Sequence, residues 1–198
     1  MQKIPSKLKK LIESFQRFPG VGYKSAERMS FNLLDMDKKY VEDFSLAIKE
    51  SLSIKRCEKC NNISEDNLCF VCLDESRKKD VVCVVADVKS LIAIENSSSY
   101  DGQYFVLNKL ISPSKGFLPV DINVDLLIQK IENFSEVILA LNSSIEGETT
   151  KLFLSDLLKS HNLKISTLGY GLPVGSNIEY SDEITIARSF ENRKEIKK

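Results

Sequence analysis

The sequence has no long apolar run and only one histidine among its 198 residues. No segment approaches the roughly 18–20 apolar residues of a membrane-spanning helix. The opening stretch, MQKIPSKLKKLIESF, also lacks the apolar centre of a secretion signal. We therefore expect a cytoplasmic protein without a membrane role, in a reducing compartment where disulfides are rare.

Several catalytic signatures are missing. No P-loop, GxGxxG or GxSxG motif occurs, so the common nucleotide-binding and nucleophile-elbow sites have no support in the sequence. The single histidine, His161, lies in the polar stretch KSHN, and no positioned partner suggests metal binding or proton transfer. We expect it at the surface, near the C-terminal end of a helix.

An excess of one charge sign is also missing, because 28 Lys and Arg residues balance 28 Asp and Glu residues. The net charge of the whole chain therefore gives no indication that it binds a polyanion. The charges are nevertheless uneven: Met1 to Arg56 contain 12 basic and 7 acidic residues. A basic first part is compatible with nucleic-acid binding there, although many solvated helices have the same composition.

Four of the five cysteines form two Cys-x-x-Cys pairs. Cys57 and Cys60 lie in KRCEKCNN, and Cys69 and Cys72 lie in NLCFVCLD. Each pair presents two sulfurs from one tight turn, and the polar link between the pairs lets them converge on one tetrahedral Zn²⁺. Two disulfides are the alternative, which a reducing compartment disfavours. Four thiolate ligands leave no position for water, so the sequence predicts one structural zinc. The fifth cysteine, Cys83 in VVCVV, is expected to be a small buried apolar side chain.

The first fifty residues have the periodicity of helices. Apolar residues recur at i, i+3, i+4 and i+7 in three successive stretches, and PGVG (19–22) separates the first two. The first stretch has one apolar stripe with lysines opposite, formed by Leu8, Leu11, Ile12, Phe15 and Phe18. In the second stretch the residues expected to face inward are Ala26, Met29, Leu33 and Leu34. The third pattern, which leads toward the first cysteine pair, consists of Val41, Phe44, Ile48 and Leu52.

The segment FPGVGYKSAERM has the arrangement of a helix-hairpin-helix turn. Gly20 and Gly22 permit a sharp turn and close backbone approach, and the helix that follows offers free N–H groups to a phosphate. Lys24 would reach the same phosphate, and Arg28, one turn later, the next one along the strand. Such contacts read the DNA backbone, so binding should be independent of sequence and sensitive to salt. The alternative is an ordinary corner between two helices.

After the cysteines, short apolar runs alternate with helical periodicity. The expected strands are DVVCVVAD (80–87), QYFVLN (103–108), EVILAL (136–141) and LKISTL (163–168). The expected helices cover 89–95, 124–133, 149–159 and 182–190. This alternation predicts an α/β layer with a largely parallel sheet.

An acidic pair follows the third of these strands, in LALNSSIEGETT. Glu146 and Glu148 flank Gly147 at the end of a strand, where α/β sheets build their sites. A metal-dependent phosphoryl-transfer site needs several converging carboxylates, and the first strand ends in Ala86 without one. The alternative is that both carboxylates favour the N-terminus of the next helix.

Together these segments resemble the bacterial recombination-repair family RecR along nearly the whole chain. The matching segments, in order, are FPGVGYKSAERMSFNLL, the four-cysteine cluster, YFVLNKLISPSKG, LALNSSIEGETT and GLPVGSNIEYSDEIT. The resemblance implies a helix-hairpin-helix region (1–54), a C4 zinc finger (55–79), a Toprim domain (80–175) and a C-terminal oligomerisation segment (176–198). It also implies DNA binding as a ring-like dimer or tetramer, and joint action with RecO and RecF in loading recombinase at gapped DNA, without catalysis.

The chain departs from the family pattern at several positions. Ala86 stands where the family has Glu, Ser90 where it has Asp, Phe105 where it has His, and Thr167 and Tyr170 near two arginines. Catalytic Toprim enzymes carry a further Asp-x-Asp, and the corresponding residues here are Asn142 and Ser144. Only Glu146 and Glu148 remain of the acidic set, which leaves two other hypotheses. One is a metal-dependent Toprim enzyme, and the other is an adaptor that holds a protein partner on these two glutamates without touching DNA.

Overall fold

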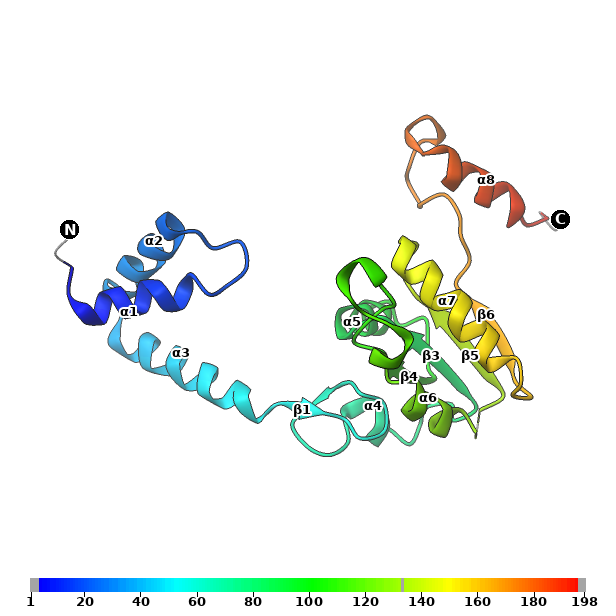
Figure 1. The fold of residues 1–198 in the computed structure, drawn as a ribbon, viewed down its shortest axis with the longest axis horizontal. Coiled ribbons are helices and arrows are strands. Elements are labelled where there is room, and N and C mark those ends of the chain that lie inside the picture. The colour runs from blue at the N-terminus through cyan, green and yellow to red at the C-terminus, as the bar shows by residue number, and fades with distance from the viewer. Residues whose placement is uncertain (1–3, 133, 196–198) are drawn as a thin grey trace. The chain divides into compact units, whose positions relative to one another are not determined.

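The computed structural model describes residues 4–132 and 134–195 (Figure 1). The chain divides into two compact units, Met1–Ile54 and Lys55–Lys198. In its described residues the first unit is helical, whereas the second contains all the strands of the described chain. The helical start and the parallel α/β layer expected from the sequence are therefore confirmed.

Three helices form the first unit. They are α1 (Ser6–Phe15), α2 (Tyr23–Leu34) and α3 (Lys38–Glu50), followed by the 3-10 turn η1 (Ser51–Ser53). Leu8 and Ile12 of α1 pack against Ala26 of α2 in a small core. Asp37 caps α3 by accepting a hydrogen bond from the Lys39 N–H at 2.8 Å.

The apolar periodicity of this unit predicts more burial than the structure contains. Phe18 is 61% exposed because α1 ends at Phe15, and Met29 and Leu34 are 40% and 61% exposed. Within the described chain, α3 buries none of its side chains, and Phe44 and Ile48 of its apolar stripe are exposed. The inward orientation expected for Met29 and Leu34 is wrong for the chain by itself, because α1 and α2 enclose only a small core.

A four-stranded parallel sheet forms the centre of the second unit. Its strands are β3 (Val81–Val85), β4 (Gln103–Val106), β5 (Glu136–Ala140) and β6 (Lys164–Thr167), in the order β4-β3-β5-β6. Cys83 of β3 lies opposite Tyr104 on one side and Ile138 on the other. All four predicted strands are present. They are joined by α5 (Val88–Asn96), α6 (Val124–Ile131) and α7 (Ile145–Leu158); residue 133, the predicted end of α6, lies outside the described residues.

Both faces of this sheet are covered, by different partners. On one face, Val82, Val84 and Phe105 pack with side chains of α6 and α7. On the other, Val85 and Tyr104 pack with α5 and with the cysteine cluster. Because successive strand residues point to opposite faces, the unbroken apolar run of β3 is what a strand buried on both sides requires.

The cysteine segment contains only small elements: the antiparallel strands β1 (Lys55–Arg56) and β2 (Ile63–Ser64) and the short helix α4 (Phe70–Leu73). Elsewhere the 3-10 turns η2 (Pro113–Lys115), η3 (Pro119–Asp121) and η4 (Ile178–Tyr180) precede the last helix, α8 (Glu183–Glu191). In the described part of the chain no helix has the length and apolar character needed to cross a membrane.

One helix begins earlier than its periodicity suggests. The sequence predicts the helix from residue 149, but α7 starts at Ile145. Ser144 sets this start, because its hydroxyl accepts a hydrogen bond from the Gly147 N–H at 3.1 Å. Glu146 and Glu148 therefore lie in the first helical turn, where negative charge is favoured.

Candidate metal centre and nucleic-acid interface

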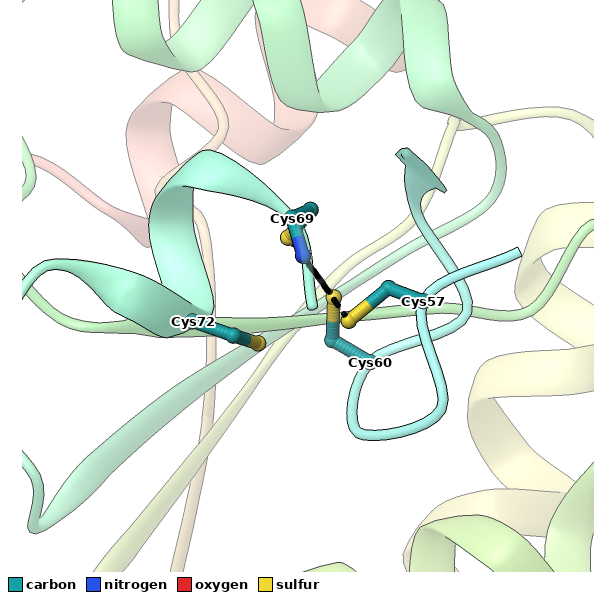
Figure 2. Close-up of side chains that lie close together, drawn as sticks. All are labelled: Cys57, Cys60, Cys69 and Cys72. Carbon is teal, nitrogen blue, oxygen red and sulfur yellow. Dashed lines mark hydrogen bonds between the residues drawn. The ribbon is translucent and has the colours of Figure 1, made fainter. Parts of the chain in front are cut away.

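The four cysteines of the two pairs converge on one point (Figure 2). Their sulfur atoms all lie within 4.8 Å of one another, and Cys57, Cys60 and Cys69 are buried. Zn–S bonds of about 2.3 Å in a tetrahedron put sulfurs about 3.8 Å apart, so the set matches a zinc site in size. None of the cysteines is in a disulfide.

Hydrogen bonds already organise these sulfurs. The Cys69 N–H donates to Cys57 Sγ at 3.4 Å, and Cys60 Sγ lies 3.4 Å from Cys69 Sγ (Figure 2). The contact with Cys69 is the largest influence on Cys60 and raises the pKa of its thiol, and the same contact lowers the pKa of the Cys69 thiol.

A buried donor next to the sulfurs also fits a metal. Asn62 is 1% exposed, and its Nδ2 has no hydrogen-bond partner among the described residues. Four thiolates around Zn²⁺ carry a net negative charge, which such an amide would complement. Cys57, Cys60, Cys69 and Cys72 are thus the ligands of one structural zinc, which when bound fixes the two turns to each other.

The zinc turn is docked on the edge of the sheet. Asn61 adopts a left-handed backbone conformation (φ +62°), which Asn tolerates. Its Nδ2 donates to the Val106 carbonyl at 2.8 Å, and the Val106 N–H donates to the Cys60 carbonyl at 2.9 Å. Asn108 reaches back to the Asn61 carbonyl at 3.3 Å. The cysteines are therefore part of the core on this face of the sheet, and they do not form a module with a separate core.

The hairpin between α1 and α2 has the predicted shape (Figure 1). Gly20 has φ +81°, a conformation that disfavours other residues, and the Val21 N–H donates to the Phe18 carbonyl at 3.1 Å. Gly22 precedes α2, and no side chain in the described chain caps that helix end.

Two cations lie on the first turns of α2. The Lys24 side chain is 89% exposed, with Nζ 3.7 Å from Glu27 Oε2, and Arg28 is exposed one turn later. Uncapped N–H groups at a helix start, followed by exposed cations at i and i+4, are suited to neighbouring phosphates of one strand.

The two carboxylates of the acidic pair are matched by cations of the same chain. Lys115 Nζ lies 3.1 Å from Glu146 Oε1, and Lys151 Nζ lies 3.0 Å from Glu148 Oε1. The pKa of Glu146 is lowered by its own backbone N–H and then by Lys115. The pairing of Lys151 with Glu148 could have been predicted from their helical spacing. The pairing of Lys115 with Glu146 could not, because the two residues are 31 positions apart in the sequence.

Tyr170 connects Glu148 to the C-terminal helix. Its hydroxyl donates to Glu148 Oε1 at 2.7 Å and contacts Lys151 Nζ. The Arg188 guanidinium of α8 lies 4.4 Å from the Tyr170 ring centroid and 3.4 Å from Glu148 Oε1. From the sequence, Tyr170 stands out only because it lies near a position where the family has an arginine. In the structure it contacts Glu148, Lys151 and Arg188.

Steric crowding explains why a glycine, Gly147, lies between the two glutamates. A Cβ on Gly147 would lie 2.0 Å from the Asn142 carbonyl oxygen, so only glycine allows the chain after β5 to pass this close to α7. Thr150 then fixes the neighbouring loop, because its Oγ1 accepts a hydrogen bond from the Ile111 N–H at 2.8 Å.

The other departures from the family pattern lie in structural positions. Ala86 and Phe105 are buried in the core under α6 and α7. Ser90 donates through its backbone N–H to Asp87 Oδ1, the cap of α5, and Thr167 Oγ1 donates to the Leu139 carbonyl at 3.0 Å. These four residues therefore serve the core and the ends of elements.

Cys83 and His161, the two other residues considered in the sequence, have ordinary environments. Cys83 is 2% exposed, and burial raises the pKa of its thiol to about 12, so it behaves as the expected apolar side chain. His161 follows the end of α7 and is half-buried, with Nδ1 3.3 Å from the Ser160 hydroxyl.

Family comparisons cover most of the chain with four matches. The RecR helix-hairpin-helix family matches residues 8–52, and the RecR zinc finger domain with four cysteine ligands matches residues 54–74. The Toprim domain matches residues 80–169, and the RecR C-terminal family matches residues 171–194. The four matches follow one another in the order in which the hairpin, the cysteines, the sheet and α8 occur.

Proposed function

The chain belongs to the RecR family, whose domains support a role in recombinational repair, and on this premise we propose that it is a noncatalytic, DNA-binding mediator. In this proposal residues 1–54 bind DNA, 55–79 form the zinc finger, 80–175 form the Toprim domain, and 176–198 serve oligomerisation. The protein acts in the cytoplasm with RecO and RecF to load recombinase at gapped DNA. It does so as a ring-like clamp that retains the strand it encircles.

The observation that carries the proposal is the hairpin. Gly20 and Gly22 form a tight turn, and the helix behind it begins without a side-chain cap from the described residues. Lys24 and Arg28 extend this site along one face of α2. We assign two neighbouring phosphates to these residues, without base contacts, so that the hairpin binds DNA of any sequence.

The absence of catalysis is part of the proposal and is supported by the acidic pair. Glu146 and Glu148 are each matched by a lysine of the same chain. Within residues 4–132 and 134–195, the four cysteines are the one group of three or more metal-ligand side chains close enough to share an ion. Phosphoryl transfer by two metals needs more carboxylates than this pair offers. We also propose that Glu146 and Glu148 contact a protein partner, whose cation would replace Lys115 or Lys151.

Oligomerisation is supported by apolar surface that each unit leaves exposed. A groove of about 570 Å³ on the first unit is lined by Phe15, Phe18, Phe44 and Ile48 among others. In the second unit, Ile184 and Phe190 of α8 are 69% and 68% exposed, respectively. Surfaces of this kind mark contacts with other chains, and we propose further copies of the same chain as the partners. Several weak hairpin contacts then add up in one assembly through effective concentration.

The DNA-binding site is tested by replacing Lys24 and Arg28 together with alanine. We expect weaker binding to gapped DNA and a shallower dependence of log K on log salt, by about 0.7 to 0.9 for each phosphate that the variant no longer neutralises. Binding is measured by fluorescence anisotropy over a salt series, and circular dichroism checks that the helices persist.

A matched control removes the same charge elsewhere on the unit. Lys7 and Lys10 are exposed in the first half of α1, so Lys7→Ala with Lys10→Ala should leave the salt slope nearly unchanged. Equal slopes for the parent and the Lys24/Arg28 variant would contradict the hairpin assignment. The protein is also incubated with nicked or gapped DNA and Mg²⁺ or Mn²⁺. If it turns over this DNA and Glu146→Gln abolishes the turnover, the protein is an enzyme and the mediator proposal is wrong.

A further inference from the structure

Asn62 is the polar side chain that the four-ligand description of the zinc site does not explain. It lies between the two cysteine pairs and is 1% exposed. Its Oδ1 accepts a hydrogen bond from the Ile63 N–H at 2.8 Å, and its backbone carbonyl accepts one from the Cys57 N–H at 2.7 Å. These two contacts fix the residue inside the turn.

The other end of this side chain is unsatisfied. Nδ2 is buried without a hydrogen-bond partner in the described chain. Buried amide donors that find no acceptor are rare, because the lost hydration is not replaced unless an acceptor arrives with a ligand. Asn61, the preceding residue, differs because its amide is satisfied by the Val106 carbonyl.

The acceptor that we assign to this donor is a cysteine sulfur. Asn62 is two positions after Cys60, and its backbone carbonyl is bonded to the Cys57 N–H, so the residue belongs to the turn that carries the first pair of sulfurs. A neutral thiol is a weak acceptor, whereas a zinc-bound thiolate accepts N–H donors well. Cys57 Sγ already receives such a donor, from the Cys69 backbone.

We propose that Asn62 is a positioning residue of the zinc centre, whose side-chain N–H donates to a zinc-bound thiolate of the cysteine cluster. The bond offsets part of the negative charge of the four thiolates in an apolar core that includes Val71 and Leu68. The zinc site then consists of four ligands and one side-chain donor behind them.

A direct test uses the parent chain loaded with ¹¹³Cd in place of zinc. An N–H···S–Cd hydrogen bond transmits scalar coupling, so NMR should detect coupling between the Asn62 side-chain amide protons and the metal. An assigned Asn62 amide without this coupling would overturn the proposal. This measurement needs no variant and does not depend on DNA binding.

Variants give the second measurement. Asn62→Ala removes the donor, and Asn62→Asp keeps the shape but turns an acceptor toward the sulfur. We expect zinc affinity, measured by chelator competition, to fall about 10- to 100-fold for Ala and further for Asp. In the cobalt-substituted proteins the thiolate-to-metal charge-transfer band should move to longer wavelength, because the sulfur loses a hydrogen bond.

The matched control is Asn67→Asp, the same chemical change at an exposed asparagine of the same segment. It should keep both the zinc affinity and the charge-transfer energy of the parent. If Asn62→Ala loses affinity while its charge-transfer band stays in place, Asn62 only supports the fold of the turn and the proposal fails. If a variant does not fold, the ¹¹³Cd coupling in the parent still decides.

Discussion

At the scale of single residues, the function of the acidic pair depends on what each carboxylate contacts. Glu148 interacts with Tyr170, Lys151 and Arg188, and Arg188 belongs to the last helix. The carboxylate therefore works as an internal contact between α7 and the C-terminal segment. A metal ion at this place would have to displace two cations of the same chain.

Replacing Glu148 by glutamine tests this role. We expect the free energy of unfolding to fall by about 1–2 kcal/mol at pH 7, because three neighbours lose a charged acceptor that is partly exposed. Urea unfolding of the zinc-loaded protein measures the change. Glu65→Gln, at an exposed glutamate, is the control and should change stability by less than about 0.5 kcal/mol.

The same variant makes a prediction about pH. The Tyr170 hydrogen bond is the largest influence that lowers the pKa of Glu148 below its usual 4.5. The folded state therefore holds its proton less tightly than the unfolded state. The stability that the Glu148 carboxylate contributes to the folded state is fully present above pH 4.5. It is lost as the pH falls through the lower pKa that Glu148 has in the folded state. Glu148→Gln should flatten this acid limb, and an identical limb in parent and variant would contradict the contact.

At the scale of elements, the sequence predicts what is local and leaves out what is distant. The strands follow from short β-branched runs, and the zinc ligands follow from Cys-x-x-Cys spacing, because both signals lie within a few residues. The contact of Lys115 with Glu146 depends on a loop and a helix that are far apart in the chain. The docking of Asn61 on Val106 likewise depends on the finished sheet. The apolar stripes of α2 and α3 predict amphipathic helices correctly, but a stripe does not reveal whether its partner is the same chain.

The docking of the zinc turn on β4 predicts a local effect of zinc removal. The Val106 N–H is bonded to the Cys60 carbonyl, so chelation should free this amide. We expect its hydrogen exchange to become at least about tenfold faster, the factor that corresponds to about 1.4 kcal/mol. Hydrogen-exchange mass spectrometry measures peptides covering β4, with β5 as the internal control because it lies between β3 and β6. Equal acceleration in both strands would mean that the whole unit unfolds without zinc, and no change in β4 would contradict the docking.

At the scale of the whole molecule, each of the two units exposes its own apolar surface. One is the groove of the first unit, to which α3 contributes Phe44 and Ile48. The other lies on the C-terminal helix α8, with Ile184 and Phe190. A chain with one self-complementary surface forms a dimer, whereas two such surfaces per chain allow closed assemblies of four. A tetrameric ring therefore requires both surfaces, and a dimer requires only one.

Charge substitutions on each surface distinguish these outcomes. Phe44→Glu with Ile48→Glu should remove the contact of the first unit, and Ile184→Glu with Phe190→Glu that of α8. For a ring of four, each pair alone should leave dimers, and all four substitutions together should leave monomers, as measured by light scattering at one protein concentration. Leu46→Glu is the matched control, because Leu46 is 52% exposed on α3 but does not line the groove. A monomer after either pair alone would show that one surface makes the whole assembly. If the assembly requires both surfaces, each pair should also weaken DNA binding although the hairpin itself is unchanged, because fewer hairpins then act together on one DNA.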